Sequence, residues 1–246
     1  MSESNGMRVT VVAPTLNEEG NIVNFLTAVC TAMPFASVLV VDDRSTDNTI
    51  VNVIEFSQNH PQVEILVRTE SKGLGSSYRE GFAKVLAGDV EIIVSMDADL
   101  SHDPAAIPAL VAAVEAGADM AIGSRYVKGG SCVGWPLHRR LLSKAGNAYT
   151  RSILGLQVQD CTSGFRAYRA STLRSINPAA TKAEGYAFLT EIVTRTAGLP
   201  LEIAEVPIAF VDRKNGKSKM SIKIILESML LVTRWGIRFQ LRGRYQ

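Results

Sequence analysis

Short apolar runs alternate with amphipathic segments through the first half of the chain. Runs rich in valine, isoleucine and leucine that are bounded by polar residues favour buried strands, and they cover residues 8–14, 37–43, 63–69, 90–97 and 118–125. Helical patterns separate them, from Asn17 to about Met33, from about Asp47 to Gln58, over 75–88, and from near Pro104. This alternation predicts an α/β fold with a mostly parallel sheet and helices on both faces.

The alternation ends near residue 126, at a glycine-rich segment. The pattern beyond it predicts a helix over 137–154, an irregular segment over 158–169, a helix over 186–197, a strand over 201–211, a basic loop over 212–219 and a helix from Ser221 onward. No linker is evident. We therefore expect one domain over 1–220, with halves at about 7–125 and 126–220, followed by a C-terminal amphipathic helix over 221–246.

Composition and charge argue against several classes of protein for this sequence, and so limit the functions to be considered. A chain of 246 residues that is 46% hydrophobic can bury a large core, and a net charge of +2 gives no electrostatic case for nucleic-acid binding. The three cysteines are scattered, which predicts a reducing compartment and no zinc finger. With neither a signal-peptide pattern nor an apolar run long enough to span a bilayer, we expect a soluble or peripheral protein.

Polar residues gather where the predicted strands end. In open parallel sheets, ligands bind at the carboxyl ends of the strands. The residues at these ends are Pro14, Asp42, Asp43, Asp97, Asp99 and Arg125. Their convergence predicts a binding site at this edge of the sheet.

The clearest chemistry belongs to the sequence Asp97-Ala98-Asp99. Paired carboxylates suit Mg²⁺ or Mn²⁺ bound together with phosphate oxygens, and such a cation stabilises a diphosphate leaving group. Ala98 is small enough to allow close approach of a nucleotide. The alternative is a solvated turn in which Asp103 and Pro104 merely start a helix.

Other acidic residues also have structural alternatives. Asp42 or Asp43 could accept hydrogen bonds from a base or ribose, or could cap the strand, and Asp47 is better explained as a helix cap. Glu18 could belong to the first turn of a helix. The glycine-rich segment at 71–81 fails the dinucleotide-binding pattern, because Tyr78 stands where the third glycine is required.

The basic residues lie mainly in the second half of the chain. Arg125 ends an apolar strand, where an unpaired guanidinium is costly, so we expect an anionic ligand or partner. Arg139, Ser143 and Asn147 recur every four residues and share one helix face. The tail helix either packs on the domain or lies on a membrane, with Trp235 and Tyr245 at the interface. The other candidate cations are Arg140, Lys144, Arg213, Lys214, Lys217 and Lys219.

Seven motifs in one order cover nearly the whole chain. They are "APTLNEEGNI", "VVDDRSTDNT", "SKGLGSSYREGF", "MDADLSHDP", "GSRYVKGG", "DCTSGFRAYR" and "FVDRKNGKSKMS". Together they resemble the polyprenol-phosphate (dolichol-phosphate) mannosyltransferases, inverting enzymes of the A-type glycosyltransferase fold with its Rossmann-like sheet. The resemblance implies transfer of mannose from GDP-mannose to a polyprenyl phosphate, giving polyprenyl β-D-mannosyl phosphate, with Mg²⁺ or Mn²⁺ as cofactor.

The resemblance also implies residue roles, and the catalytic set is Asp97, Asp99, Arg125 and Arg213. The donor-binding set is Pro14, Leu16, Glu18, Val41, Asp43, Asp97, Ala98, Asp99, Arg125, Arg213 and Lys219. The acceptor-phosphate set is Arg125, Arg139 and Ser143, and the metal set is Asp97, Asp99 and Ser101. Two positions depart from the family pattern, because many members have glutamine where Ser101 stands and tyrosine where Leu16 stands.

The resemblance further implies a cytoplasmic protein, peripheral on the cytosolic face of a membrane, which it reaches directly or through an integral membrane partner. Two other readings stay open. The same fold could transfer glucose or another sugar from a UDP donor to a polyprenyl phosphate. A phosphoacceptor signalling module also pairs acids at a strand end, but it needs a lysine at a later strand end, where Arg125 stands here.

Overall fold

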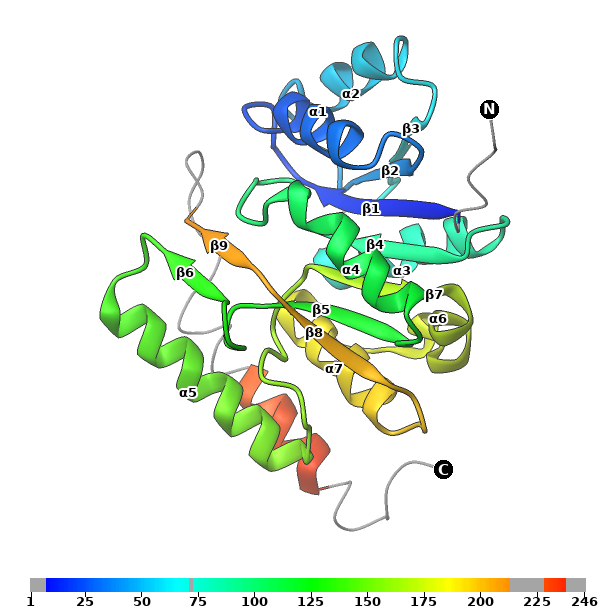
Figure 1. The fold of residues 1–246 in the computed structure, drawn as a ribbon. Helices are drawn as coiled ribbons and strands as arrows, with labels where there is room; N and C mark the ends of the chain where they lie inside the picture. Colours follow the sequence, from blue (N-terminus) through cyan, green and yellow to red (C-terminus); the bar gives the residue numbers. More distant parts are fainter. Residues whose placement is uncertain (1–7, 71–72, 213–227, 238–246) are drawn as a thin grey trace.

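The computed structural model describes residues 8–70, 73–212 and 228–237, and these residues build a central sheet with helices on both faces (Figure 1). In spatial order the sheet consists of β3 (Val63–Val67), β2 (Ser37–Asp42), β1 (Val9–Thr15), β4 (Ile92–Ser95), β7 (Arg166–Arg169), β5 (Met120–Ser124) and β8 (Ile203–Pro207). All neighbours pair in parallel except β7, which is antiparallel to both β4 and β5. The five strands predicted for the first half are confirmed, with ends that differ by a few residues.

Helices cover the two faces of the sheet and bury two apolar clusters. The helices on one face are α1 (Ile22–Ala32), α2 (Thr49–Ser57) and α4 (Ile107–Glu115), and those on the other are α3 (Leu74–Leu86), α6 (Ala170–Ile176) and α7 (Gly185–Ala197). Because successive side chains of a strand point to opposite faces, Val11 lies in one cluster and Val12 in the other. Helix α3 lies so close to the sheet that a Cβ on Gly81 would stand 2.8 Å from methyl groups of Val12 and Val41.

The segment 158–169 is not wholly irregular, as the sequence suggested, because its last four residues form β7 in the middle of the sheet. This strand does not show an apolar pattern in the sequence, because arginines stand at both of its ends, Arg166 and Arg169. Arg166 is fully buried, and its guanidinium donates to the carbonyl oxygens of Ser163, Leu189 and Cys161. These hydrogen bonds are what make a charged residue tolerable inside a sheet.

The predicted strand over 201–211 is also wrong in part, because it divides into β8 and β9 (Ala209–Val211). Strand β8 pairs with β5, whereas β9 pairs with β6 (Ser131–Val133) in a separate two-stranded sheet. The change of partner follows from the end of β5 at Ser124. In Figure 1, β8 and β9 continue in one line and carry the chain toward the region of β6 and α5 (Leu137–Leu154).

The helix boundaries were predicted unevenly. Helix α5 matches the predicted range 137–154, whereas α1 begins at Ile22 rather than at the predicted Asn17. Asn17 has a φ of 57°, and its side-chain oxygen accepts from the backbone N–H of Thr46, so it joins the loops after β1 and β2. Asp103 accepts from the N–H of Ala105 and caps the short helix η1 (Pro104–Ala106) before α4.

The described part of the C-terminal segment, residues 228–237, is helical and packs on α5 (Figure 1). Val232 is buried, and the hydroxyls of Thr233 and Tyr149 lie 2.6 Å apart. For these ten residues packing on the domain is observed, while the rest of the predicted tail helix lies outside the described residues. No helix in the described ranges combines the length and apolar character needed to cross a membrane.

Candidate active site

The carboxyl ends of β1, β2 and β4 bring most of the predicted donor residues to one edge of the sheet. Pro14 on β1 lies opposite Val41 on β2, and Thr15 lies opposite Asp42. Leu16 and Glu18 follow in the connection from β1 to α1. The Glu18 carboxylate accepts from the Asn21 side chain at 2.8 Å, but Glu18 precedes α1, whose first turn has no acidic residue, so the first-turn alternative for this residue is wrong.

The two neighbouring aspartates at the end of β2 differ in what they bind. Asp42 accepts from the hydroxyls of Thr15 and Ser45 at 2.9 and 2.6 Å, so it fixes the loop. Asp43 is buried in an ion pair with Arg68, and its other oxygen accepts from the N–H of Gly73 at 3.1 Å. Arg68, which was not singled out in the sequence, therefore fixes the orientation of Asp43.

At the N-terminus of α3, backbone N–H groups donate hydrogen bonds to carboxylates of the protein itself. Asp43 accepts from Gly73, and the Glu184 carboxylate accepts from the N–H of Ser76 at 3.0 Å. A Cβ on Gly75 would stand 2.8 Å from the carbonyl oxygen of Ala183, so the glycine is needed for close packing. Since a helix N-terminus attracts anions, these contacts explain the glycine-rich segment without a bound phosphate.

The loop after β4 carries the predicted metal residues. Asp99 and Ala98 are buried, and Asp99 accepts from the N–H of Ser101 at 2.9 Å. Asp97 faces Gly164, where a Cβ would stand 3.6 Å from its carboxylate. Within the residues that the structure describes, the buried hydroxyl oxygen of Ser101 has no hydrogen-bond partner.

These residues fit a divalent cation of the Mg²⁺ or Mn²⁺ type. Such ions take oxygen ligands and are commonly held by one or two carboxylates together with substrate phosphates and water. The described ranges contain no group of three or more histidine, cysteine or acidic side chains arranged to hold a metal ion. The protein would therefore supply the Asp97 and Asp99 carboxylates and the unpaired Ser101 oxygen, and other ligands would come from the substrate and solvent.

His102 follows this loop and is fully buried between Phe165 and Phe210, with ring centroids 5.4 and 5.0 Å away. Burial lowers the pKa of His102 to about 4, although the Asp99 charge acts in the opposite direction. The imidazole is therefore neutral at neutral pH and adds no cation beside Asp99.

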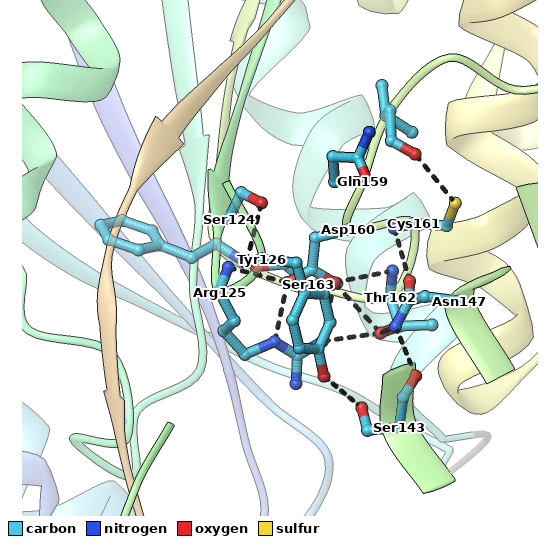
Figure 2. Close-up of polar contacts among 12 residues, drawn as sticks. Ser124, Arg125, Tyr126, Ser143, Asn147, Gln159, Asp160, Cys161, Thr162 and Ser163 are labelled. Atoms are coloured by element: carbon cyan, nitrogen blue, oxygen red, sulfur yellow. Dashed lines mark hydrogen bonds and ion pairs between the residues drawn. The ribbon is translucent and has the colours of Figure 1, made fainter. Parts of the chain in front are cut away.

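Arg125, at the end of β5, has an aspartate of the same chain as its partner (Figure 2). Its Nε and one terminal nitrogen, Nη2, each donate to the Asp160 carboxylate at 2.7 Å. Burial raises the pKa of Asp160, but the Arg125 charge and hydrogen bonds outweigh burial and hold that pKa below its usual value. The anionic partner expected for Arg125 is therefore found within the protein.

One edge of the Arg125 guanidinium stays open. Counting only the residues described, its second terminal nitrogen, Nη1, has no protein acceptor. Rings of Tyr126, Trp135 and Phe210 surround the guanidinium at 5.2 to 5.7 Å. Asp160 thus holds Arg125 in one orientation and leaves a single nitrogen for a ligand.

The loop that contains Asp160 also contacts α5. Thr162 accepts from Arg125 at 2.7 Å and from the Asn147 amide at 3.2 Å, and Tyr126 donates to the Ser143 hydroxyl at 2.6 Å (Figure 2). Ser143 and Asn147 therefore face the same network, as the four-residue spacing predicted. Because β7 separates β4 from β5 in the sheet, this loop lies between the Asp97 region and Arg125.

Arg139 lies one turn before Ser143 on α5, at the edge of this network. Its guanidinium stacks on Trp135 at 4.0 Å from the ring centroid and pairs with Asp212 at 3.0 Å. Arg213 and Lys219, the remaining predicted donor residues, lie outside the described residues.

Comparison with known proteins agrees with this geometry. The model of glycosyl transferase family 2 matches residues 10–176. The chain belongs to glycosyl transferase family 2. Within the family it is 44% identical over 237 residues to an undecaprenyl-phosphate mannosyltransferase of Micrococcus luteus, covering 96% of this chain and 97% of that protein. It is 42% identical to a polyprenol monophosphomannose synthase of Mycolicibacterium smegmatis, with 95% and 89% covered.

Solved structures share the fold of this family 2 protein at lower identity. A glucosyl-3-phosphoglycerate synthase from Mycobacterium tuberculosis, in complex with phosphoglyceric acid, has a TM-score of 0.67 and 19% identity over 93% of this chain and 81% of that one. The same enzyme with Mn²⁺, uridine diphosphate and its product has a TM-score of 0.66 and 22% identity, covering 98% and 82%. These similarities confirm the A-type glycosyltransferase fold predicted from the sequence motifs.

Proposed function

We propose that this protein transfers mannose from GDP-mannose to the phosphate of a polyprenol, releasing GDP and forming polyprenyl β-D-mannosyl phosphate. The observation that carries the proposal is the complete engagement of Asp160. Both of its oxygens accept from Arg125, and further N–H groups of Arg125, Thr162 and Ser163 bind the same carboxylate. A carboxylate so engaged, with a lowered pKa, is a poor general base.

A phosphate monoester acceptor has no need of a base. It is already ionised at neutral pH, so it can attack the anomeric carbon directly. Attack in line with the departing diphosphate inverts an α-linked donor to a β-linked product. The names of the relatives at 42 and 44% identity support the same acceptor class for this chain.

On the donor side, Pro14, Leu16, Glu18, Val41 and Asp43 would line the nucleotide pocket. Asp97, Ala98, Asp99 and Ser101 would lie against the diphosphate. A bound Mg²⁺ or Mn²⁺ would neutralise charge on the departing diphosphate, and Asp97 and Asp99 would hold it. Arg213 and Lys219 are proposed to bind the same diphosphate, although both lie outside the described residues.

On the acceptor side, Arg125 would offer its open nitrogen and Arg139 its guanidinium to the lipid phosphate. The Ser143 hydroxyl accepts from Tyr126, so its own hydrogen can be donated to a phosphate oxygen. These donors would hold two anions close together and align the nucleophile, which is the main catalytic need for a pre-ionised acceptor.

A lipid acceptor requires contact with a membrane, and we infer a peripheral association on the cytosolic face, either direct or through an integral membrane partner. Exposed apolar and basic side chains occur together on the first turns of α5, next to Arg139 and Ser143. The exposed residues are Leu137, Leu141, Leu142, Arg140 and Lys144. Apolar side chains beside basic ones suit an anionic bilayer surface, and sedimentation with anionic lipid vesicles tests this association.

The test of function is a panel of nucleotide sugars assayed with one short-chain polyprenyl phosphate in detergent. GDP-mannose should give the fastest transfer, and the product should carry a β linkage. Faster transfer from UDP-glucose would replace the proposed sugar and base while keeping the acceptor. Phosphorylation of Asp97 by a small phosphodonor, without sugar transfer, would instead favour the signalling-module alternative.

A further inference from the structure

Arg139 already holds an anion of the protein itself. One of its terminal nitrogens, Nη1, lies 3.0 Å from each carboxylate oxygen of Asp212, and its guanidinium stacks on Trp135. Arg139 is also one of the residues proposed to bind the acceptor phosphate. Asp212 occupies the Nη1 nitrogen of this guanidinium, so a phosphate that approaches the same nitrogen must displace the carboxylate.

The backbone, rather than the ion pair, holds Asp212 in place. Its N–H donates to the carbonyl oxygen of Val133 at 3.3 Å, and the N–H of Val211 donates to that of Ser101 at 3.0 Å. Strand β9, which ends at Val211, is thus tied to β6 on one side and to the Asp97–Ser101 loop on the other. The carboxylate is presented to Arg139 by a fixed main chain.

The Arg139–Asp212 pair is open to exchange, in contrast to the pair of Arg125 with Asp160. Its side chains are 34% and 43% exposed, against 8% and 0% for Arg125 and Asp160. Within the described ranges, Arg139 supplies all the hydrogen bonds to the Asp212 side chain. Exposed ion pairs contribute little to stability, so an incoming anion can replace this carboxylate at small cost.

We propose that Asp212 is an intramolecular competitor for the acceptor-phosphate site, whose carboxylate occupies Arg139 until the lipid phosphate displaces it. Trp135 would keep the guanidinium in place during the exchange. The inference rests on the proposed function, since it takes Arg139 as an acceptor residue. Its consequence is that every anion, inorganic phosphate and lipid phosphate alike, must displace the Asp212 carboxylate before Arg139 can bind it fully.

An intramolecular competitor weakens the binding of every anion at this site by the same factor. The test variant is Asp212→Asn, and the matched control is Asp89→Asn. Asp89 also pairs with an arginine, Arg8, and is exposed, so its substitution removes the same charge from a surface pair that is not part of the proposed site. Asp212→Asn should lower the KM for polyprenyl phosphate and the inhibition constant of inorganic phosphate equally, by about two- to fivefold. The KM for the donor should not change, and Asp89→Asn should behave as wild type.

Three outcomes for the acceptor KM and the inhibition constant of inorganic phosphate would overturn the proposal. If Asp212 served to orient Arg139, Asp212→Asn would raise the KM for the acceptor, and this rise, or no change at all, would overturn the proposal. Unequal changes for the two anions would also contradict it, because a general electrostatic effect acts more strongly on the more highly charged anion.

A binding measurement separates this proposal from the proposed function. The chain has two tryptophans, so Trp235→Phe leaves Trp135, which touches Arg139, as the single fluorescent reporter. Titration with inorganic phosphate should then saturate at lower concentration in Asp212→Asn, whether or not mannose is transferred. An Arg139→Ala variant that still gives the wild-type phosphate titration would instead reject Arg139 as an acceptor residue.

Discussion

The carboxylates of the Asp97–Ser101 loop and the arginines of the acceptor region around α5 are held in different ways. The Asp97–Ser101 loop follows one strand, and its described contacts include short-range ones such as that between Asp99 and Ser101. The acceptor region joins residues far apart in the chain, such as Arg125 with Asp160 and Arg139 with Asp212. The difference teaches that substitutions at the donor edge should chiefly affect rate, whereas substitutions in the acceptor network affect stability and binding according to burial.

The largest expected effect is on stability, in Asp160→Ala. Removing this carboxylate leaves the Arg125 guanidinium buried without its partner, which should cost about 3–5 kcal/mol of unfolding free energy. Urea denaturation of wild type, Asp160→Ala and Asp97→Ala measures it, and Asp97→Ala should lose much less because Asp97 is only partly buried. Equal losses would remove the distinction between the two regions.

The second largest expected effect is a fall in kcat in the variant Asp99→Ala. If this carboxylate holds the cation that stabilises the departing diphosphate, kcat should fall by a factor of about 100 or more, and a hundredfold loss corresponds to about 2.7 kcal/mol of activation free energy. The circular dichroism spectrum should stay that of wild type. Asp103→Ala in the same loop is the matched control. It should keep its kcat and lose about 1 kcal/mol of stability through the missing helix cap.

A smaller effect is expected on substrate binding, in Arg139→Ala. Loss of one charge-assisted hydrogen bond to the lipid phosphate should raise the acceptor KM by about tenfold or more, with the donor KM unchanged. Steady-state assays that vary each substrate separately measure both constants. Arg140→Ala, one residue along the helix, should change neither constant when the acceptor is a short-chain lipid in detergent. A change in the donor KM alone would move Arg139 to the other substrate.

The smallest effect is on stability, in Asp212→Ala. Its ion pair with Arg139 is partly exposed, so its loss should change the unfolding free energy by less than about 1 kcal/mol. Urea denaturation beside Asp160→Ala gives the comparison directly. A loss as large as that of Asp160→Ala would show that Asp212 is a structural residue and not an exchangeable one.

The fold was predictable from sequence where the signal is local. Apolar runs of seven or eight residues mark β1 to β5, and polar residues at their ends mark the edge where the site lies. Strand β7 was not predicted because Arg166 interrupts its apolar pattern. The burial of Arg166 depends on carbonyl acceptors as far away in the chain as Leu189. No local pattern could reveal those acceptors.

The candidate site, like the fold, was predictable from the sequence only where its signal is local. The motif at Asp97–Asp99 and the spacing of Arg139, Ser143 and Asn147 are visible in the chain itself. The partners that determine what the arginines can do, Asp160 and Asp212, lie 35 and 73 residues away from them in sequence. Pairing over such separations depends on topology: the Arg125–Asp160 pair depends on the antiparallel insertion of β7 between β4 and β5, and the Arg139–Asp212 pair on the pairing of β9 with β6.

Binding of Mn²⁺ in the presence of GDP, followed by electron paramagnetic resonance, tests the central claim about Asp97 and Asp99 most directly. We predict that wild type binds one Mn²⁺ per chain when GDP is present, and that Asp99→Ala loses this binding while Asp103→Ala keeps it. Retention of the same Mn²⁺ affinity by Asp99→Ala, or full transfer activity of wild type with all divalent metal chelated, would contradict the account.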